Sequence, residues 1–419
     1  MEGPSFVTRL GEFAAFVRAS GRAVSDGGAA YRRWLAFLAA WIALGALAWS
    51  QQLRDGMSVT AMTDQVPWGA YIANFSFTVG LASSALVLIA QRYLRRDPGP
   101  DASALVVVGQ VAAIAALSMA MLFVVVDIGR PDRAWHLVPG LGRFNFPISL
   151  LSWDVVVLNG YLALNLYMAT YAILARYRGR PLDPKKYGPV LGAGVLFAVS
   201  IHVVAAFLYC GLAGRSHWHS AVLAPRVVAS AFGSGPALLT IVLMVMRDRM
   251  GVPVREETLA SLLRVVTAAA WANLFLFGAE VFTELYGGSV HATPLRYLLF
   301  GLHGHHLLVP FMWLALALNV GATAVLSSPL RAREPLVRVA CGATVVGMWI
   351  EKGMGHVVPG FIPSSLGEIV EYSPSLHETL VSAAVWAVGA LLLTLMLKVA
   401  VPVVFGGLRL HGRAPEGSP

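Results

Sequence analysis

Charged and amide side chains interrupt several long apolar runs of this sequence, and their types and spacing suggest chemistry. Asp127 ends one such run, in VVVDIGRPDRAWH, where Arg130 and Arg133 follow it closely. A carboxyl group at the edge of an apolar segment can exchange a proton with a redox ligand, since desolvation and nearby guanidinium groups tune its charge. An Asp–Arg pair that closes a helix end explains the same residues without chemistry, so both interpretations stay open.

A second polar face lies in VPWGAYIANF, at the start of an earlier apolar run. Tyr71, Asn74 and Thr78 are spaced i, i+3 and i+7, so they share one face of a helix that begins near Trp68. These groups could line a ligand site. Asn74 could equally bond the backbone of a neighbouring helix as packing.

Two polar stripes with the spacing i, i+7 and i+11 lie within later apolar runs. The first holds Asp154, Tyr161 and Asn165, and the second holds Asn273, Glu280 and Glu284. Such groups are costly in lipid and must face the interior of a helix bundle, where they predict a proton path. Interhelical hydrogen bonding without transport is the alternative.

Histidines are the remaining candidates, because two on facing helices could ligate a b-type haem. His202 has Tyr209 at i+7, and three histidines occur in GLHGHH, residues 301–306. Their positions near helix ends do not suit two stacked haems, although the sequence leaves haem open. The cysteines, Cys210 and Cys341, are far apart and lack CxxC spacing, so we expect no iron–sulfur cluster or cysteine zinc site in this chain.

Composition indicates the elements that position these residues. Of 419 residues, 57% are hydrophobic and 13% are charged, whereas a soluble domain is roughly a quarter charged. Apolar runs long enough to cross a bilayer recur along the chain. We therefore predict an all-α integral membrane protein with about ten transmembrane helices, at approximately 31–51, 68–90, 104–126, 150–175, 187–208, 225–246, 262–286, 297–326, 335–350 and 377–404. Gly301, Gly304 and Pro310 predict that the eighth helix is bent or begins late.

Lysine and arginine assign the sides of the membrane. Of the 31 such residues, 23 fall at the two ends and in alternate connections, and 8 fall in the others. Because cytoplasmic segments are enriched in positive charge, both termini should be cytoplasmic in a bacterial inner membrane. The basic residues form short clusters rather than a continuous stripe, so the net charge of +9 does not indicate nucleic-acid binding.

Six segments together resemble the NrfD, or polysulfide reductase membrane-subunit, family, and within it the ten-helix HybB-like (DsrP/QrcD-like) branch. They are VPWGAYIANFSFTVGLA, DIGRPDRAWHLVPGLGRFNFP, SWDVVVLNGYLALN, AFLYCGLAGR, FGAEVFTELY and WIEKGMGHVVPGFIPSSLGEIVEYSPSLHE. The resemblance implies a haem-free membrane subunit that binds menaquinone or menaquinol near the outer face. It also implies electron exchange with a ferredoxin-like iron–sulfur subunit, and further redox subunits such as a molybdopterin-type or multihaem cytochrome protein.

Hydropathy, charge and residue spacing, together with the bundle that the resemblance implies, predict an organisation of the chain. A cytoplasmic segment with an interfacial amphipathic helix occupies 1–30, and the transmembrane domain occupies 31–404. Within it, a quinone bundle spans about 66–210 and a second bundle about 225–350, with flanking helices 31–51 and 377–404. Residues 405–419 form a cytoplasmic tail.

Matching motifs place the expected site in the first bundle. Asp127 and His202 are the expected catalytic residues, and the expected quinone-binding residues are Trp68, Tyr71, Asn74, Asp127, His202 and Tyr209. In this prediction His202 or Asn74 bonds a quinone carbonyl, and Asp127 relays a proton. With no redox centre of its own, the chain would be a non-autonomous subunit of a quinone-linked oxidoreductase.

Three other functions fit some of the same residues. A proton or ion transporter subunit would use the stripes through Asp154 and Glu280, and a b-type haem anchor would use the histidines. A purely structural anchor would leave the polar stripes to packing alone. The sequence sets neither the direction of quinone chemistry nor whether turnover moves protons.

Overall fold

Helices account for nearly all regular structure in the described part of the chain. The computed structural model describes residues 6–84, 88–89, 100–138, 140–288 and 292–410. In these ranges the helices, apart from short 3-10 turns, are α1 (Phe6–Ser25), α2 (Ala29–Asp55), α3 (Ala70–Leu81), α5 (Pro100–Asp127), α6 (Leu150–Tyr177), α7 (Pro184–Cys210), α8 (Leu223–Met250), α9 (Glu256–Gly287), α10 (Ala292–Phe300), α11 (Val309–Ser327), α12 (Glu334–Lys352), α13 (Met354–Val357) and α14 (Leu376–Val404). The predicted all-α membrane fold is confirmed.

Eight of the described helices are long and apolar enough to cross a membrane: α2, α5, α6, α7, α8, α9, α11 and α14. The two remaining predicted spans correspond to shorter or less apolar helices. α3 has 12 residues, and part of its predicted span, 68–90, lies outside the described residues. α12 has 19 residues but carries Glu334 in its first turn and Glu351 and Lys352 in its last.

The predicted eighth span is divided, and its long helix begins late. α10 ends at Phe300, and α11 begins at Val309. Gly301 and Gly304 between them have φ of 78° and 88°, a conformation that glycine adopts without steric cost. Pro310 then stands in the first turn of α11, where its missing N–H is not needed. The glycines therefore end one helix, and the proline starts the next.

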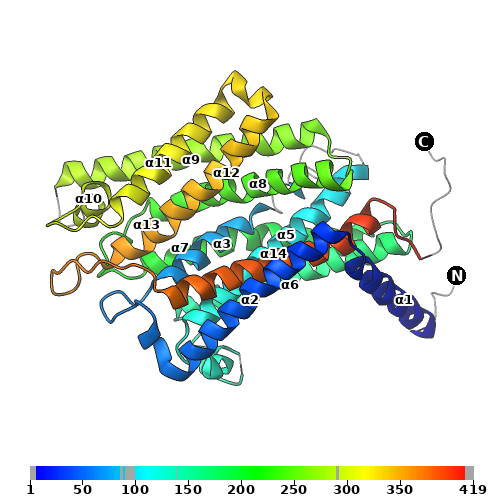
Figure 1. The fold of residues 1–419 in the computed structure, drawn as a ribbon, viewed down its shortest axis with the longest axis horizontal. Coiled ribbons are helices and arrows are strands. Elements are labelled where there is room, and N and C mark those ends of the chain that lie inside the picture. The colour runs from blue at the N-terminus through cyan, green and yellow to red at the C-terminus, as the bar shows by residue number, and fades with distance from the viewer. Residues whose placement is uncertain (1–5, 85–87, 90–99, 139, 289–291, 411–419) are drawn as a thin grey trace.

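The long helices pack as two groups of four with a flanking pair (Figure 1). In the first group α3 packs on α5, α5 on α6, and α6 on α7. In the second group α8 packs on α9 and α12, and α11 packs on α12 and α9. The groups meet where α8 contacts α3 and α7, while α2 and α14 pair and α14 packs on α5.

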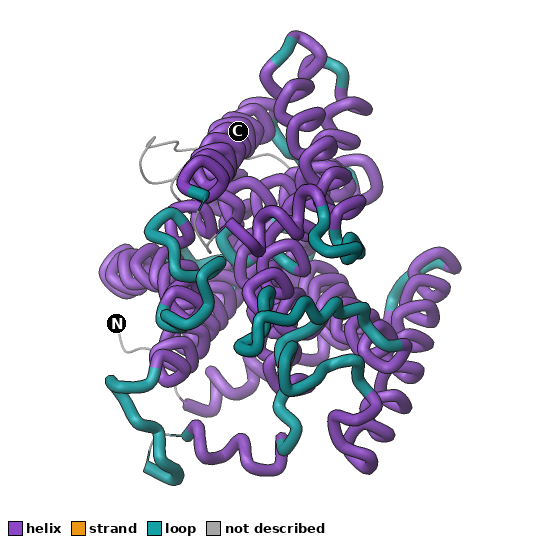
Figure 2. Tube along the Cα trace, turned by 90° about the vertical axis from the view of Figure 1, so that its left-hand side faces the viewer, coloured by secondary structure: helices purple, strands orange, loops and turns teal. Residues whose placement is uncertain are grey.

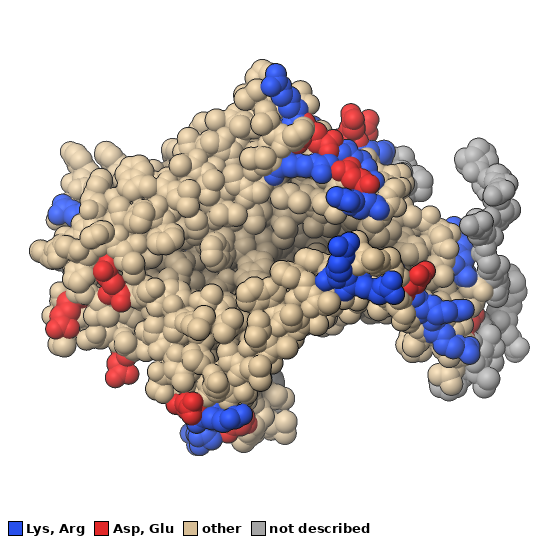
Figure 3. All heavy atoms as spheres, in the orientation of Figure 1, with Lys and Arg blue, Asp and Glu red and all other residues tan. Residues whose placement is uncertain are grey.

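The molecule has two distinct ends along its long axis. The helix α1 and the end of α14 lie at one end, here called the terminal end, and the loops 56–69 and 362–375 lie at the other, here called the loop end (Figure 1). Figure 2 views the loop end and shows several connecting segments crossing it. Most of the Lys and Arg visible in Figure 3 lies toward the terminal end. This separation of charge supports the proposal that the terminal end is cytoplasmic.

The orientation is testable with topology reporters. A reporter fused after Pro419 or inserted in 178–186 should report cytoplasm, and one in 287–293 should report the opposite side, because positive charge is retained inside. Alkaline phosphatase and green fluorescent protein fusions give complementary signals. A reversed pattern would contradict the proposed orientation.

Candidate functional site

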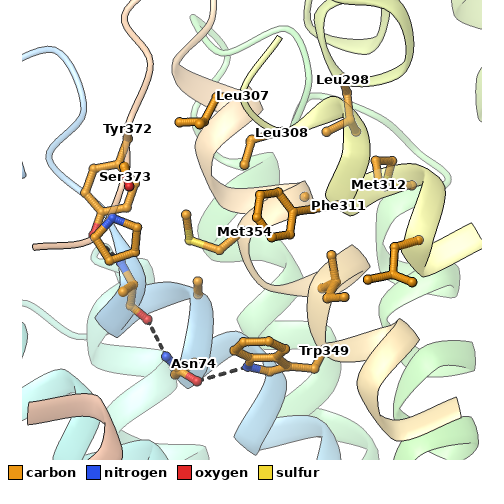
Figure 4. Close-up of a pocket in the computed structure, with 16 residues that line it drawn as sticks. Asn74, Leu298, Leu307, Leu308, Phe311, Met312, Trp349, Met354, Tyr372 and Ser373 are labelled. Carbon is orange, nitrogen blue, oxygen red and sulfur yellow. Dashed lines mark hydrogen bonds between the residues drawn. The ribbon is translucent and has the colours of Figure 1, made fainter. Parts of the chain in front are cut away.

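A cavity of about 480 Å³ opens near the loop end, between α3, the α10–α11 region, α12, α13 and the segment before α14. Its walls include Ala70, Asn74, Phe311, Trp349, Met354 and Tyr372 (Figure 4). The volume falls within the roughly 300–1,000 Å³ of small-molecule sites. Because most of the lining side chains are apolar and only a few are polar, the cavity suits a flat, largely apolar ligand with a few polar atoms.

Asn74 supplies a fixed polar group in this wall. Its Nδ2 donates to the carbonyl of Ala70 at 2.8 Å, one turn earlier in α3. Its Oδ1 accepts hydrogen bonds from the indole nitrogens of Trp349, at 3.0 Å, and Trp386, at 2.9 Å. Two indoles from different helices thus fix the amide, and one amide hydrogen is left to donate to a ligand.

Tyr372 connects the cavity to a buried carboxylate. Its hydroxyl accepts a hydrogen bond from the backbone N–H of Ala70 at 2.8 Å and donates one to Glu378. Glu378 also accepts from the N–H groups of Ala61, at 2.8 Å, and Ser375, at 2.9 Å. Its side chain is fully buried in the first turn of α14, where the helix dipole favours negative charge. Burial raises the pKa of Tyr372 above its ordinary value, and the neighbouring charge of Glu378 adds to the effect.

Asp127 and Tyr71 lie close to Glu378 but do not line the cavity. The Tyr71 hydroxyl donates to Gln52 at 2.7 Å, and Gln52 donates to the carbonyl of Val126 at 2.7 Å. The Oδ1 of Asp127 is shielded from solvent and has no hydrogen-bond partner among the described residues. Asp127, Tyr71 and Glu378 interact electrostatically. The helix end at Asp127 therefore holds a half-buried carboxyl group, with one oxygen shielded, that interacts electrostatically with Glu378.

The aromatic residues predicted for the site belong to a separate cluster. Trp68 packs on Tyr209, with ring centroids 5.7 Å apart, and on Trp218, at 5.5 Å. The Tyr209 hydroxyl donates to Ser76 at 3.2 Å. Trp68 and Tyr209 thus lie together in packed surroundings, and neither is among the residues that line the cavity.

His202 is buried on α7 and does not line the cavity. Its Nδ1 lies 2.6 Å from the carbonyl of Ala198, so Nδ1 carries the proton and Nε2 is the basic nitrogen. Nε2 has no hydrogen-bond partner among the described residues. His202 interacts electrostatically with Lys352, which comes from the second helix group.

The first polar stripe lies inside the first helix group. Asp154, Tyr161 and Asn165 are all buried on α6. Asn165 donates to the carbonyl of Tyr161 at 2.8 Å, and the Oδ1 of Asp154 has no partner among the described residues. Asp154 and Asp127 both interact electrostatically with Tyr209, so this stripe extends toward the loop end.

The second stripe meets a buried cluster of charges, which we call the Arg226 triad: Arg226, Glu280 and Glu351. Arg226 pairs with Glu280 and lies 2.9 Å from Glu351. Asn273 donates to both oxygens of Glu351, at 3.1 and 3.2 Å. Asn319 adds a bond to Glu351 at 2.7 Å. The triad joins α8, α9 and α12 inside the second group, while Glu284 lies farther along α9.

Several of these residues are not apparent from the sequence. Arg226 and Lys352 are two of the eight Lys and Arg residues counted in the outer connections, but the structure places both inside the helix groups, and they are buried. Arg226 is the second residue of the predicted span 225–246, and this position could have indicated that its side chain lies inside the membrane domain. Glu351, Tyr372 and Glu378 fall within the WIEK to SLHE segment that carried the family resemblance, without roles assigned.

No cluster of three or more potential metal ligands occurs among the residues that the structure describes. The histidines of GLHGHH lie in the loop between α10 and α11, where His305 Nδ1 lies 3.3 Å from Glu371. Burial opposes ionisation of Glu371, but hydrogen bonds led by the Leu307 N–H hold its pKa below the ordinary value. These histidines therefore lie in a loop rather than inside the helix that the sequence predicts for 297–326.

The fold and these buried groups define a multi-pass integral membrane protein whose helix bundles enclose a ligand-sized cavity and internal charges. The chain belongs to the family described as polysulphide reductase, NrfD, whose pattern matches residues 58–354. That match runs from the loop before α3 into α13.

Three relatives show what kinds of protein the chain is similar to. It is 28% identical to the membrane subunit of a putative dimethyl sulfoxide reductase of Halobacterium salinarum, over 64% of this chain and 67% of the relative. It is 22% identical to a selenate reductase subunit of Mesobacillus selenatarsenatis, over 86% and 92%. It is 25% identical to the Hdr-like menaquinol oxidoreductase integral membrane subunit of Archaeoglobus fulgidus, over 48% and 47%.

Proposed function

We propose that this chain is the quinone-binding membrane subunit of an oxidoreductase complex, and that its site is the cavity beside Asn74. The names of all three relatives describe subunits of such enzymes, and one name includes menaquinol. The observation that carries the proposal is the 480 Å³ cavity, in which an anchored amide and a tyrosine–glutamate pair meet an apolar slot.

The residues present fit a naphthoquinone such as menaquinone. Phe311, Met354 and other apolar side chains offer surfaces for the ring and tail, and the free amide hydrogen of Asn74 can donate to a carbonyl. When bound, the quinone would supply electron transfer coupled to protonation. The protein would orient the ring, exclude water and exchange protons at the Tyr372 hydroxyl.

We assign Asp127 a role in proton transfer, although it does not line the cavity. A proton at the Tyr372 hydroxyl can pass to the Glu378 carboxylate, to which it is already hydrogen-bonded. Asp127 interacts electrostatically with Glu378 and ends α5 at the loop end. A water that bridged the two carboxyl groups would carry the proton from Glu378 to Asp127, which would exchange it with the surface. In this proposal Asn74 binds the quinone and Asp127 relays a proton, while Tyr71 maintains the hydrogen bond to Gln52 beside Asp127. His202, Trp68 and Tyr209 do not contact the quinone ring.

The loop end is the proposed docking surface for redox partners. An iron–sulfur protein of the ferredoxin-like kind would dock there, because the cavity lies near that end. Further redox proteins, molybdopterin-type or multihaem, would exchange electrons with that iron–sulfur protein. We place the complex in the bacterial inner membrane, with both termini cytoplasmic, and the chain in the HybB-like branch.

A second function is favoured by the Arg226 triad and the stripe through Asp154. Buried ionisable groups in both helix groups provide sites where protons can rest inside the membrane. We propose that quinone turnover is coupled to proton movement through them. A transporter without redox activity would share these groups but would not need the cavity beside Asn74.

Binding of a quinol analogue tests the proposed site. Purified chain in detergent should bind 2-heptyl-4-hydroxyquinoline N-oxide saturably, as measured by quenching of its fluorescence. Asn74→Leu should weaken this binding about 10-fold or more, because it removes a hydrogen bond worth roughly 1–1.5 kcal/mol and frees the two indoles that shape the wall.

Asn159 is a matched control, since it is exposed on α6 and donates a hydrogen bond to its own helix backbone, the carbonyl of Val155, at 2.8 Å. Asn159→Leu should leave binding unchanged. Equal affinity for wild type and Asn74→Leu would move the site away from this cavity, and no saturable binding by wild type would refute quinone binding.

A further inference from the structure

Lys352 occupies an unusual place between the two helix groups. It is the last residue of α12, directly after Glu351, and only 7% of it is exposed. Glu351 points into the second group, where it completes the Arg226 triad. Lys352 instead reaches α3, since a Cβ built on Gly80 would lie 3.0 Å from its Nζ. Two neighbouring residues of one helix thus serve different groups.

The Lys352 ammonium group has no hydrogen-bond partner among the described residues. A buried cation without a partner is costly, so such atoms in folded proteins usually bond ordered water. Two other shielded polar atoms nearby also lack partners in the described chain: Oδ1 of Asn273 and Nε2 of His356.

A cavity of about 10 Å³ brings these three residues together. Lys352, Asn273 and His356 all line it, as do Arg226 and Glu351. One water molecule needs a cavity of roughly 10–15 Å³ and two to four polar partners. The cavity has the volume of a single water and partners that are otherwise unsatisfied.

We propose that this cavity binds one water, and that Lys352 uses it to pass protons between the first helix group and the Arg226 triad. This inference rests on the proposed coupling of quinone turnover to proton movement. Lys352 also interacts electrostatically with His202, whose ring lies against the backbone of Gly80, the residue of α3 that Lys352 approaches. Among the described residues, the charged and titratable groups linked to Lys352 directly or through the triad are His202 on α7, Arg226 on α8, Glu280 on α9, Glu351 on α12, His356 on α13 and His217 in the loop before α8.

The transfer balances without any other reactant. The protonated Nζ gives a proton to the water oxygen as the water gives one of its own to a carboxylate oxygen of Glu351. One N–H bond and one O–H bond break, two O–H bonds form, and the lysine is left neutral. A protonated His202 would return a proton to the neutral Nζ, with one N–H bond broken and one formed, and this completes passage from the first helix group. The reverse sequence moves a proton from Glu351 to His202.

Substitutions at Lys352 separate proton exchange from charge. The intact complex, purified through this chain, is reconstituted in proteoliposomes with dimethylnaphthoquinol as donor and ferricyanide as acceptor, and the rate without protein is subtracted. Lys352→Met removes the charge, and Lys352→Arg keeps a charge that cannot be released. Both variants should lower the proton-to-electron ratio to roughly half or less, because neither can cycle a proton. Lys398→Met, at the terminal end, should leave the ratio unchanged.

The outcomes distinguish this link from the proposed function. Unchanged binding of the quinol analogue in both Lys352 variants, with a reduced ratio, supports the link. A wild-type proton-to-electron ratio in Lys352→Arg would overturn the link, since a fixed positive charge at this position would then be enough for proton movement. A cryo-electron microscopy map that resolves ordered water gives a readout independent of turnover and of variant folding. Density within hydrogen-bond distance of Nζ in the wild-type cavity supports the site, and an empty cavity overturns it.

Discussion

Replacing Asp127 by asparagine should slow quinone-linked electron transfer by about 100-fold or more, the loss typical of a missing acid–base group. Asparagine keeps the shape of the side chain but cannot exchange a proton. The complex should still assemble and bind the quinol analogue, because Asp127 lies behind the cavity wall rather than in it. Quinol oxidation by the purified complex measures the effect.

Asp132 provides the control from the same connection. It is exposed and paired with Arg130 at 2.9 Å. The hydrogen bond from Arg130 holds the pKa of the Asp132 carboxyl below its ordinary value, so this group stays ionised near neutral pH. Asp132→Asn should therefore leave turnover close to wild type. Full activity in Asp127→Asn would show that Asp127 only closes the end of α5.

Removing the cation of the Arg226 triad should destabilise the protein strongly. Arg226→Met leaves Glu280 and Glu351 buried without their common counter-ion, and breaking a buried pair in this way costs about 3–5 kcal/mol. Glu280→Gln should lower the stability far less, because Arg226 and Glu351 remain as an ion pair with no net charge. Thermal unfolding of the purified chain in detergent should give a much lower Tm for Arg226→Met than for Glu280→Gln.

A rescue experiment separates charge from packing. The triple variant Arg226→Met, Glu280→Gln, Glu351→Gln contains no buried charge in the triad and should regain much of the lost Tm. Equal Tm values for Arg226→Met and Glu280→Gln would contradict the charge argument. In proteoliposomes Glu280→Gln should also lower the proton-to-electron ratio, since its amide cannot carry a proton.

The helices were predictable wherever a long apolar run faces lipid or the core. α5 is an example, with an apolar sequence that ends at Asp127, the predicted edge of the membrane. α12 was harder to predict as a membrane span, because charged residues occupy both of its ends. The break between α10 and α11 was visible in its glycines, since backbone conformations with positive φ favour that residue.

The site was only partly predictable, because its partners come from distant segments. Asn74 was found from the face that it shares with Tyr71 and Thr78. Its indole partners lie 275 and 312 residues away, and Arg226 is 125 residues from Glu351. No local spacing reveals such pairs. The pattern Ser375 to Glu378 is typical of a helix start, which hid the contact between Glu378 and Tyr372.

Photoaffinity labelling with an azido-naphthoquinone tests whether the quinone ring binds in the cavity beside Asn74, because it reports where the ring rests in the native complex. We expect saturable labelling of peptides that contain residues 70–74, 349–355 and 372–374, and loss of that label with excess unlabelled naphthoquinone or in Asn74→Leu. Specific labelling confined to other segments, such as α6 or α9, would contradict the assignment of the quinone site to this cavity.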